Sequence, residues 1–406
     1  MIIDRPKDIE RLKGTAKWTL LFGRRKTGKS FLVENYTTYD EFFYVKTDRG
    51  ITSKKGNRSV AYEAFLALLK HLLSEGKTVV VDEFHRLGED FFDELHAVGR
   101  GGRLILVSST LHMAKKLIGA HSALLGLVAE VPLGLISMED CLRAIGKTGI
   151  GKKEKVELAL LLREPIVSNY SLEAKPPREQ FASALQGSMK TVPALVGEIF
   201  AEEERTASAT YGGILRAVAN GKVVSGEISS FLFARKLVRK DDPSLVQPYL
   251  KNLIEFGILR RVEVLGKNKF IYKHVSPLCR LFYYADEKYN ISERNAAKEE
   301  VLRIVDGLLP RMVEDEIRSL AAEKYGLSEA VMEGKDFDVD ACLMKFRKVE
   351  IAMEVKWKGR IGADDIRKAE ESLGKIDAKE KWLFVPDKKM VGIKTSLKVI
   401  DIDDLA

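Results

Sequence analysis

The sequence has little cysteine, and its few cysteines are scattered. Cys141, Cys279 and Cys342 lie far apart, and none belongs to a C-x-x-C pair. This spacing argues against a cysteine-based metal cluster and against a disulfide framework. We therefore expect a protein of the reducing cytoplasm.

Long apolar runs are also missing. The stretch 124–135 is interrupted by Glu130 and Pro132, whereas a membrane-spanning helix needs about 20 apolar residues. The opening Met-Ile-Ile-Asp-Arg-Pro lacks the basic start and the apolar stretch of a secretory signal. Repeats and low-complexity tracts are absent as well. We expect no secretory leader and no membrane partner.

The composition is that of a globular chain with more than one domain. With 406 residues, 45% hydrophobic and 31% charged, the chain has enough apolar side chains for two or three cores. Its formal net charge of +8 suits a polyanionic partner such as nucleic acid, although a solvated lysine-rich surface would also produce it.

Short apolar segments alternate with helical patterns in the first hundred or so residues. We predict helices from about residue 29, over 62–73 and over 91–98. The predicted strands are 18–22, 42–45, 78–81 and 104–107. Such alternation predicts an α/β fold with a parallel, doubly wound sheet.

A glycine-bearing loop follows the first predicted strand. Residues 23–30 read Gly-Arg-Arg-Lys-Thr-Gly-Lys-Ser and fit the P-loop pattern G-x-x-x-x-G-K-[ST]. Backbone N–H groups of such a loop surround phosphates, Lys29 reaches the β and γ phosphates, and Ser30 ligates Mg²⁺. The following helix offers its N-terminus to the same anion. We predict ATP and Mg²⁺ as cofactors. The predicted nucleotide-binding residues are Gly23, Arg24, Arg25, Lys26, Thr27, Gly28, Lys29, Ser30 and Phe31.

An acidic pair ends the strand Val79-Val80-Val81. Asp82 can hold magnesium through water, and the carboxylate of Glu83 can polarise the attacking water. We predict Asp82 as a metal ligand, and Glu83 and Lys29 as catalytic residues. Ser108-Ser109-Thr110 follows the next strand. These residues either orient the γ-phosphate or cap a helix, and both interpretations stay open.

These motifs together resemble the archaeal-type AAA+ ATPases, P-loop proteins close to the STAND class. The resemblance rests on residues 23–30, on 81–85 (Val-Asp-Glu-Phe-His) and on 106–109 (Leu-Val-Ser-Ser). The family usually has glutamine where His85 stands, and often an arginine after a glycine beyond the sensor strand. Here Gly126 is followed by Leu127, which favours slow or partner-dependent turnover.

The segment 205–290 is different in kind. Helices over 211–219, 226–233 and 245–256 precede strands over 259–264 and 269–273, the order of a winged helix-turn-helix. The third helix carries the candidate outward residues Gln247, Tyr249, Lys251 and Asn252. The surrounding basic residues are Lys236, Arg239, Lys240, Arg260, Arg261, Lys267 and Lys269. This footprint predicts DNA as a partner, although winged helices also dock proteins. Residues 253–259 again resemble the archaeal family, whose middle domain is of this type.

Acidic and apolar residues alternate near the C-terminus. We predict helices over 296–309 and 313–324, interrupted at Pro310, then strands over 337–344 and 349–357. A helix over 363–373 and strands over 381–385 and 398–402 follow. If the first two strands form a hairpin, Asp338 and Glu354 approach each other with Lys356 beside them. Two carboxylates and a lysine can bind Mg²⁺ and orient water on a phosphodiester.

An Asp followed after about fifteen residues by Glu-x-Lys resembles the PD-(D/E)xK nuclease superfamily, and in particular the DUF234 domain that ends many archaeal ATPases of this kind. The resemblance rests on residues 336–341 and on 354–357 (Glu-Val-Lys-Trp), with Asp340 unusual at its place. The family's upstream helix has a glutamate four residues before an arginine, and Glu314 with Arg318 fits, Glu316 being the fallback. The resemblance implies Asp338, Glu354 and Glu314 as metal ligands, and Glu354 and Lys356 as catalytic. A solvated strand face in a degenerate nuclease fold is the alternative.

The sequence therefore predicts four parts: a P-loop ATPase core at 1–136, a helical lid at 137–204, a winged helix-turn-helix at 205–290 and a small α/β nuclease-like domain at 291–406. We expect a protein that binds and hydrolyses ATP and couples its nucleotide state to DNA binding, with metal-dependent cleavage if the C-terminal site is intact. The alternative is a nucleotide-controlled partner-docking switch with an inactive nuclease-like domain. A homo-oligomer is compatible with both.

Overall fold

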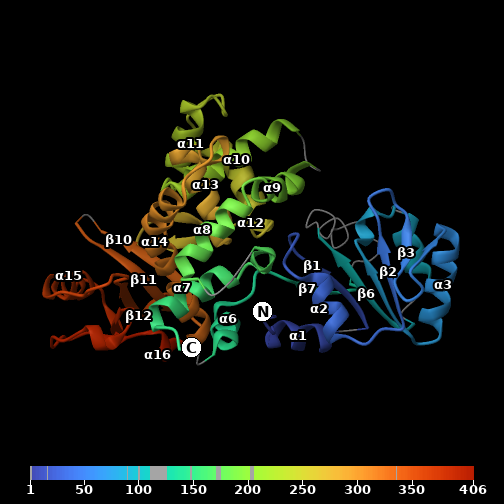
Figure 1. The fold of residues 1–406 in the computed structure, drawn as a ribbon, viewed down its shortest axis with the longest axis horizontal. Helices are drawn as coiled ribbons and strands as arrows, with labels where there is room; N and C mark the ends of the chain where they lie inside the picture. Colours follow the sequence, from blue (N-terminus) through green and yellow to red (C-terminus); the bar gives the residue numbers. More distant parts are fainter. Residues whose placement is uncertain are drawn as a thin grey trace. The chain divides into compact units, whose positions relative to one another are not determined.

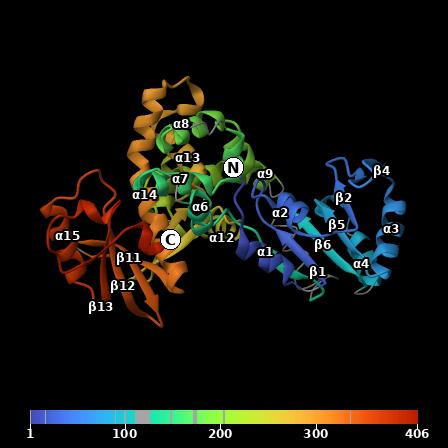
Figure 2. The same cartoon turned by 60° about the horizontal axis from the view of Figure 1, so that its bottom comes forward.

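The computed structural model describes residues 2–15, 17–88, 90–98, 101–109, 126–146, 149–170, 175–201, 205–334 and 336–406. The chain divides into two compact units, one of residues 4–135 and one made chiefly of residues 136–406. Figures 1 and 2 show the elements of each. None of the helices in the described part combines the length and the apolar composition that crossing a membrane requires.

The first unit is built on a seven-stranded sheet in the order β4-β3-β2-β5-β6-β1-β7. Five strands are parallel: β1 (Trp18–Phe22), β2 (Glu41–Val45), β5 (Thr78–Asp82), β6 (Arg103–Ser108) and β7 (Ala129–Pro132). The short strands β3 (Ile51–Ser53) and β4 (Arg58–Val60) add an antiparallel edge that the sequence did not predict.

Both faces of this sheet are buried, which explains the unbroken apolar runs of its strands. Val79 and Val81 pack in one core with the helices α3 (Tyr62–Ser74) and α4 (Asp90–Val98). Val80 packs in the other core with α1 (Pro6–Lys13) and α2 (Lys29–Tyr36). Successive side chains of a strand point to opposite faces, so each central strand feeds both cores. The predicted doubly wound parallel sheet is confirmed.

The second unit begins with helices and continues with a hairpin. Its first helices are α6 (Met138–Ile145), α7 (Lys152–Leu162), α8 (Pro177–Gly187) and α9 (Thr191–Ala201). Then follow α10 (Arg205–Ala219), α11 (Ser225–Ala234), α12 (Gln247–Glu255), β8 (Leu259–Val264), β9 (Lys269–His274) and α13 (Pro277–Tyr289). The three helices and the two strands that were predicted in the middle segment are therefore present in the predicted order.

A second seven-stranded sheet has the order β14-β13-β12-β11-β10-β8-β9. Its remaining strands are β10 (Ser328–Glu333), β11 (Asp338–Lys345), β12 (Lys348–Val355), β13 (Ala378–Phe384) and β14 (Lys398–Ile400), with helices α15 (Ala363–Gly374) and α16 (Ile402–Leu405). The hairpin β8-β9 is part of this sheet, because β8 pairs in parallel with β10. The backbone N–H of Leu265 donates to the carbonyl of Val331 at 2.9 Å. The middle and C-terminal segments thus share one sheet.

A single helix, α14 (Lys298–Tyr325), replaces the two helices predicted around Pro310. A proline inside a helix lacks its N–H donor and crowds the preceding turn, at a cost of about 3 kcal/mol. On both sides of Pro310 the helix buries apolar side chains, Leu308 and Leu309 before it and Met312 and Val313 after it. Each such burial is worth about 1.5–3 kcal/mol, so packing outweighs the proline and the helix continues.

Candidate functional site

The loop of residues 23–30 joins β1 to α2, and both of its glycines are required by the backbone. A Cβ added to Gly23 would lie 2.1 Å from the carbonyl oxygen of Leu133. Gly28, the residue that precedes α2, has φ +90°, a region that side chains rarely adopt. The hydroxyl of Thr27 donates to the carbonyl of Arg24 at 3.0 Å and braces the turn.

Lys29 folds back onto this loop. Its Nζ donates to the carbonyl oxygens of Gly23 and Arg24, each at 2.8 Å, and the residue is 5% exposed. Burial lowers the pKa of Lys29 to about 8, against the opposing charges of Glu83 and Asp82. The ammonium is thus held beside the loop by two carbonyls that phosphate oxygens could replace.

Ser30 and Asp82 meet where the loop faces the end of β5. The Ser30 hydroxyl donates to Oδ2 of Asp82 at 2.7 Å. The other oxygen, Oδ1, is buried and has no hydrogen-bond partner within the described part of the chain. Burial raises the pKa of Asp82. A hydroxyl and a carboxylate with an unsatisfied oxygen form a hard oxygen donor set, so these residues fit Mg²⁺.

Glu83 has a left-handed backbone, with φ 57°, which is uncommon for a residue other than glycine and is often found at functional sites. Its Oε2 accepts a hydrogen bond from the Ser109 hydroxyl at 2.8 Å and lies 3.3 Å from Arg86 Nη2 and 3.5 Å from His85 Nε2. Two roles were open for Ser109 from the sequence, a phosphate contact or a helix cap. In the structure its hydroxyl contacts the candidate base. Thr110 lies outside the described residues.

Arg86 and His85 lie next to the Glu83 carboxylate and are themselves held by neighbouring residues. Arg86 Nη1 donates to the carbonyl of Val45 at 2.7 Å, and its guanidinium lies 5.9 Å from the ring centre of Tyr44. Nδ1 of His85 is 3.2 Å from the Ser108 hydroxyl, and burial lowers the pKa of His85 to about 4, so the ring is neutral at pH 7. Arg86 was not among the site residues predicted from the sequence. Its signal is an arginine three residues after the acidic pair.

The other predicted loop residues contribute in different ways. Lys26 is exposed and left-handed, with φ 62°, whereas Arg24 and Arg25 are partly buried. Phe31 is 42% exposed on α2. Leu127, which stands where the resembled family often has arginine, packs against the core between the sheet and α3 and α4.

In the C-terminal sheet, the structure brings Asp340 rather than Asp338 beside Glu354. Ala341 of β11 lies opposite Met353 of β12, so Asp340 and Glu354 are the next pair along the hairpin. Lys356 Nζ donates to Glu354 Oε2 at 2.6 Å. Asp338, the first residue of β11, is exposed and lies opposite Glu333 of β10.

Burial and neighbouring negative charges raise the pKa values of two of these acids. Burial, and then the charge of Asp340, raise the pKa of Glu354 to about 7. Burial, with the charges of Asp340 and Asp315, likewise raises the pKa of Glu314 to about 7. Glu316, the fallback, is ion-paired with Arg163 instead. Within the described ranges, however, no three His, Cys, Asp or Glu side chains converge closely enough to hold a metal. These acidic side chains lie near one another, but they do not form a group of metal ligands. Lys356 forms an ion pair with Glu354.

Arg318 belongs to a buried ionic cluster beneath this face. It donates to the carbonyl of Asp340 at 2.8 Å and pairs with Asp315 at 2.5 Å. Asp315 also pairs with Arg280 at 2.7 Å and with Lys273 of β9 at 3.3 Å. These cations hold the pKa of Asp315 well below its usual range, against its burial. The role of Arg318 here is therefore to support the backbone of β11.

The middle segment exposes only part of its predicted basic footprint. Gln247 and Lys251 are exposed on α12. The ring of Tyr249 packs on Tyr211 of α10 at 5.0 Å, and Asn252 Nδ2 donates to the Tyr211 hydroxyl at 2.7 Å. The prediction that Tyr249 and Asn252 point outward was wrong, because the side of α12 that they occupy packs against α10.

Comparisons with known proteins find no matching family model and no matching curated protein. Among solved structures, the Walker-type ATPase of Pyrococcus abyssi is 18% identical over 70% of this chain and 96% of its own, with a TM-score of 0.49. The ORC2 protein of Aeropyrum pernix, in ADPNP–ADP complexes, is 14% identical over 76% and 91%, with a TM-score of 0.36. CDC6P of Pyrobaculum aerophilum is 15% identical over 77% and 93%, with a TM-score of 0.29. Likenesses of this strength establish neither a family nor an activity for the chain.

Proposed function

We propose that the first unit binds ATP with Mg²⁺ and hydrolyses it. The observation that supports this most is the contact between Ser30 and Asp82, which leaves a buried carboxylate oxygen unsatisfied next to the loop that carries Lys29. Parallel strands place the loop, Asp82 and Ser109 at one sheet edge, the edge where ligands of such sheets bind. The test is an ATP titration of the wild-type protein and of a Lys29→Ala variant, with Mg²⁺ and with EDTA.

Each residue has a separate part in this reaction. The loop N–H groups and the N-terminus of α2 bind phosphate, and Lys29 exchanges its two carbonyl partners for phosphate oxygens. Ser30 and Asp82 would hold Mg²⁺, which neutralises charge on the phosphates when bound. Glu83 accepts a proton from the attacking water. Ser109 and Arg86 keep one oxygen of Glu83 fixed, so the second is left to face the water.

We also propose that the middle segment binds DNA. Residues 205–290 contain 15 Lys and Arg against 7 Asp and Glu, an excess equal to the +8 of the whole chain. Such a concentration attracts a polyanion and gives salt-dependent binding. A gel shift with DNA that weakens steeply as salt rises is the expected result. No shift, together with assembly that depends on ATP or ADP, would instead favour a partner-docking switch.

A nuclease role of the C-terminal face is a further candidate function, and it requires Glu314, Asp340 and Glu354 to move closer together, because no three acidic side chains of the described residues form a metal site. It is supported by the gathering of Glu314, Asp340, Glu354 and Lys356, and by the raised pKa values of the two glutamates. With supercoiled plasmid and Mg²⁺ or Mn²⁺, we expect nicking that Glu354→Ala and Asp340→Asn remove. Asp338→Asn is the matched control and should nick normally. If no duplex, branched or single-stranded substrate is cut, the face has a structural role.

A further inference from the structure

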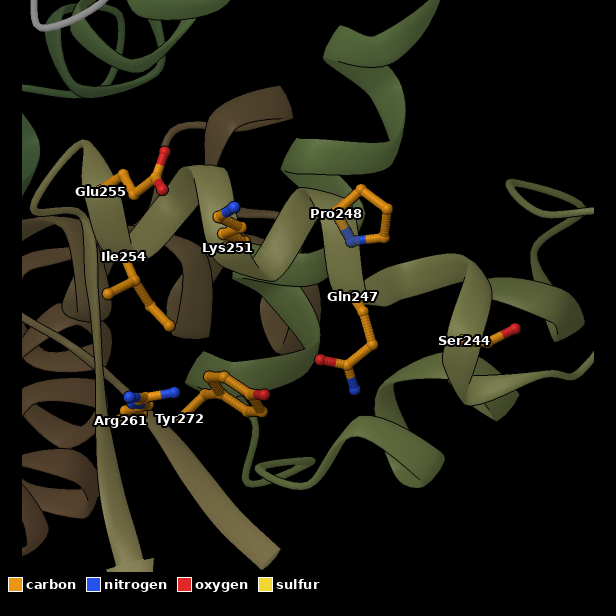
Figure 3. Close-up of a pocket in the computed structure, with 8 residues that line it drawn as sticks. All are labelled: Ser244, Gln247, Pro248, Lys251, Ile254, Glu255, Arg261 and Tyr272. Atoms are coloured by element: carbon orange, nitrogen blue, oxygen red, sulfur yellow. The ribbon is translucent and has the colours of Figure 1, made fainter. Parts of the chain in front are cut away.

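A pocket of about 800 Å³ lies between helix α12 and the hairpin β8-β9 (Figure 3). Helix α12 and the turn before it contribute one wall, and the two strands contribute the other. In Figure 3 the side chains of Gln247 and Ile254 point from the helix toward Tyr272 and Arg261 on the strands. Pockets of this size hold small organic ligands, and a nucleotide is within their range.

The lining combines an apolar wall with a cationic rim. Ile254 is partly buried and Tyr272 is 7% exposed, so the inner surface is formed by an aliphatic side chain and an aromatic ring. Lys251 and Arg261 are exposed and bring a positive charge from each wall. The Gln247 amide, which has a donor and an acceptor, lies at the same opening. Among the described residues that line the pocket, Glu255 is the only one with a carboxylate.

This lining has the chemistry of single-stranded nucleic-acid sites. Bases stack or pack on aromatic and apolar side chains, cations hold the phosphates, and amides read base edges. The exposed cations Lys236, Arg239 and Lys240 of the same segment add positive charge that attracts such a strand.

The wing, the hairpin of β8 and β9 with its turn, has basic residues that already pair with acidic residues of the same chain. Lys269 and Lys267 reach Glu333 of β10 at 2.6 and 3.5 Å. Arg260 pairs with Glu329 and donates to the carbonyl of Asp315 at 2.9 Å. The hairpin is further fixed by the pairing of β8 with β10. Arg260, Lys267 and Lys269 are therefore paired within the chain, and Arg261 of β8 remains exposed among the described cations of the hairpin.

We propose that this pocket takes an unpaired nucleotide of a DNA strand. The base packs against Tyr272 and Ile254, its edge meets the Gln247 amide, and Lys251 and Arg261 hold the adjoining phosphates. A paired base cannot enter a hollow between helix and hairpin, because it stays inside the duplex stack. The inference rests on the proposed DNA-binding function and specifies which form of DNA the middle segment selects.

The experiment is fluorescence anisotropy on the full-length protein, with one labelled strand, alone and in a duplex, at one low salt concentration. Gln247→Trp fills the pocket without changing charge, and Gln247 is exposed in the first turn of α12, so the fold should survive. An unchanged thermal unfolding midpoint checks this. We expect single-strand affinity to fall about 10-fold or more, as lost base stacking does elsewhere, with duplex affinity nearly unchanged.

Charge reversals provide the matched comparison. Lys251→Glu with Arg261→Glu alters the rim of the pocket, and Lys236→Glu with Arg239→Glu makes the same charge change at exposed positions outside it. The first pair should weaken single-strand binding more than duplex binding, and the second should weaken both alike. If Gln247→Trp keeps wild-type affinity for the single strand, or loses affinity equally for both DNA forms, the pocket is not the site of an unpaired nucleotide. The proposal that the middle segment binds DNA would not be affected by that result. If the wild-type protein binds neither form, the DNA proposal fails as well.

Discussion

Replacing Lys29 by alanine is expected to weaken ATP binding about 10- to 100-fold and to slow hydrolysis about 100- to 1,000-fold further. The first figure corresponds to one or two charge-assisted hydrogen bonds to phosphate, and the second to one lost donor at a developing negative charge. The ammonium already lies against the loop at two 2.8 Å contacts, so little rearrangement separates it from a phosphate. Calorimetry measures the affinity, and phosphate release measures turnover.

A matched control separates this effect from a change in charge or stability. Lys77 is exposed just before β5, and parallel strands place that position at the sheet edge opposite the loop. Lys77→Ala removes the same charge from the same unit and should leave both measurements unchanged. Undiminished affinity and hydrolysis in Lys29→Ala would refute the nucleotide-binding assignment.

The nucleotide-binding loop could be located from sequence because its determinants are local. The residues that close around Lys29 lie within eight positions of one another, and the strands that support them are buried on both faces and read as plain apolar runs. The role of Arg86 could not be predicted from the sequence. Its partners are Tyr44 and the carbonyl of Val45, which belong to a strand about forty residues earlier. Only the pairing of β2 with β5 brings them together.

At the C-terminal face, the alternation of residues predicts which side chains share a face but not which residues of two strands pair. Alternation along a strand tells which residues share a face, and Asp338 and Asp340 share one. It cannot tell which of them lies opposite Glu354, because a shift of two residues keeps every side chain on the same face. The observed register of Ala341 with Met353 selects Asp340.

The wing shows a second limit of sequence reasoning. Its lysines read as a DNA footprint because the sequence alone does not show which carboxylates pair with them. Glu333, which lies 64 residues beyond Lys269 in the chain, becomes a neighbour only through β10, a strand that the sequence did not predict. Basic residues on a hairpin are therefore weak evidence for nucleic acid until the neighbouring strand is known.

Replacing Glu83 by glutamine is expected to separate ATP binding from hydrolysis. Glutamine has nearly the shape of glutamate, and its amide oxygen can still accept from the Ser109 hydroxyl, but it cannot take a proton from water. Hydrolysis should fall about 100- to 10,000-fold, the usual contribution of a general base, while affinity for ATP changes little. Single-turnover phosphate release and an ATP titration measure the two quantities.

A Ser109→Ala variant is the graded comparison for Glu83→Gln. It removes the 2.8 Å hydrogen bond but leaves the carboxylate and its contact with Arg86, so it should slow hydrolysis by only about 10-fold, the value of one neutral-to-charged hydrogen bond. His85 does not replace Glu83, because a ring with its pKa lowered to about 4 is a weak base. Wild-type turnover in Glu83→Gln would therefore mean that the attacking water loses its proton to a group other than this carboxylate.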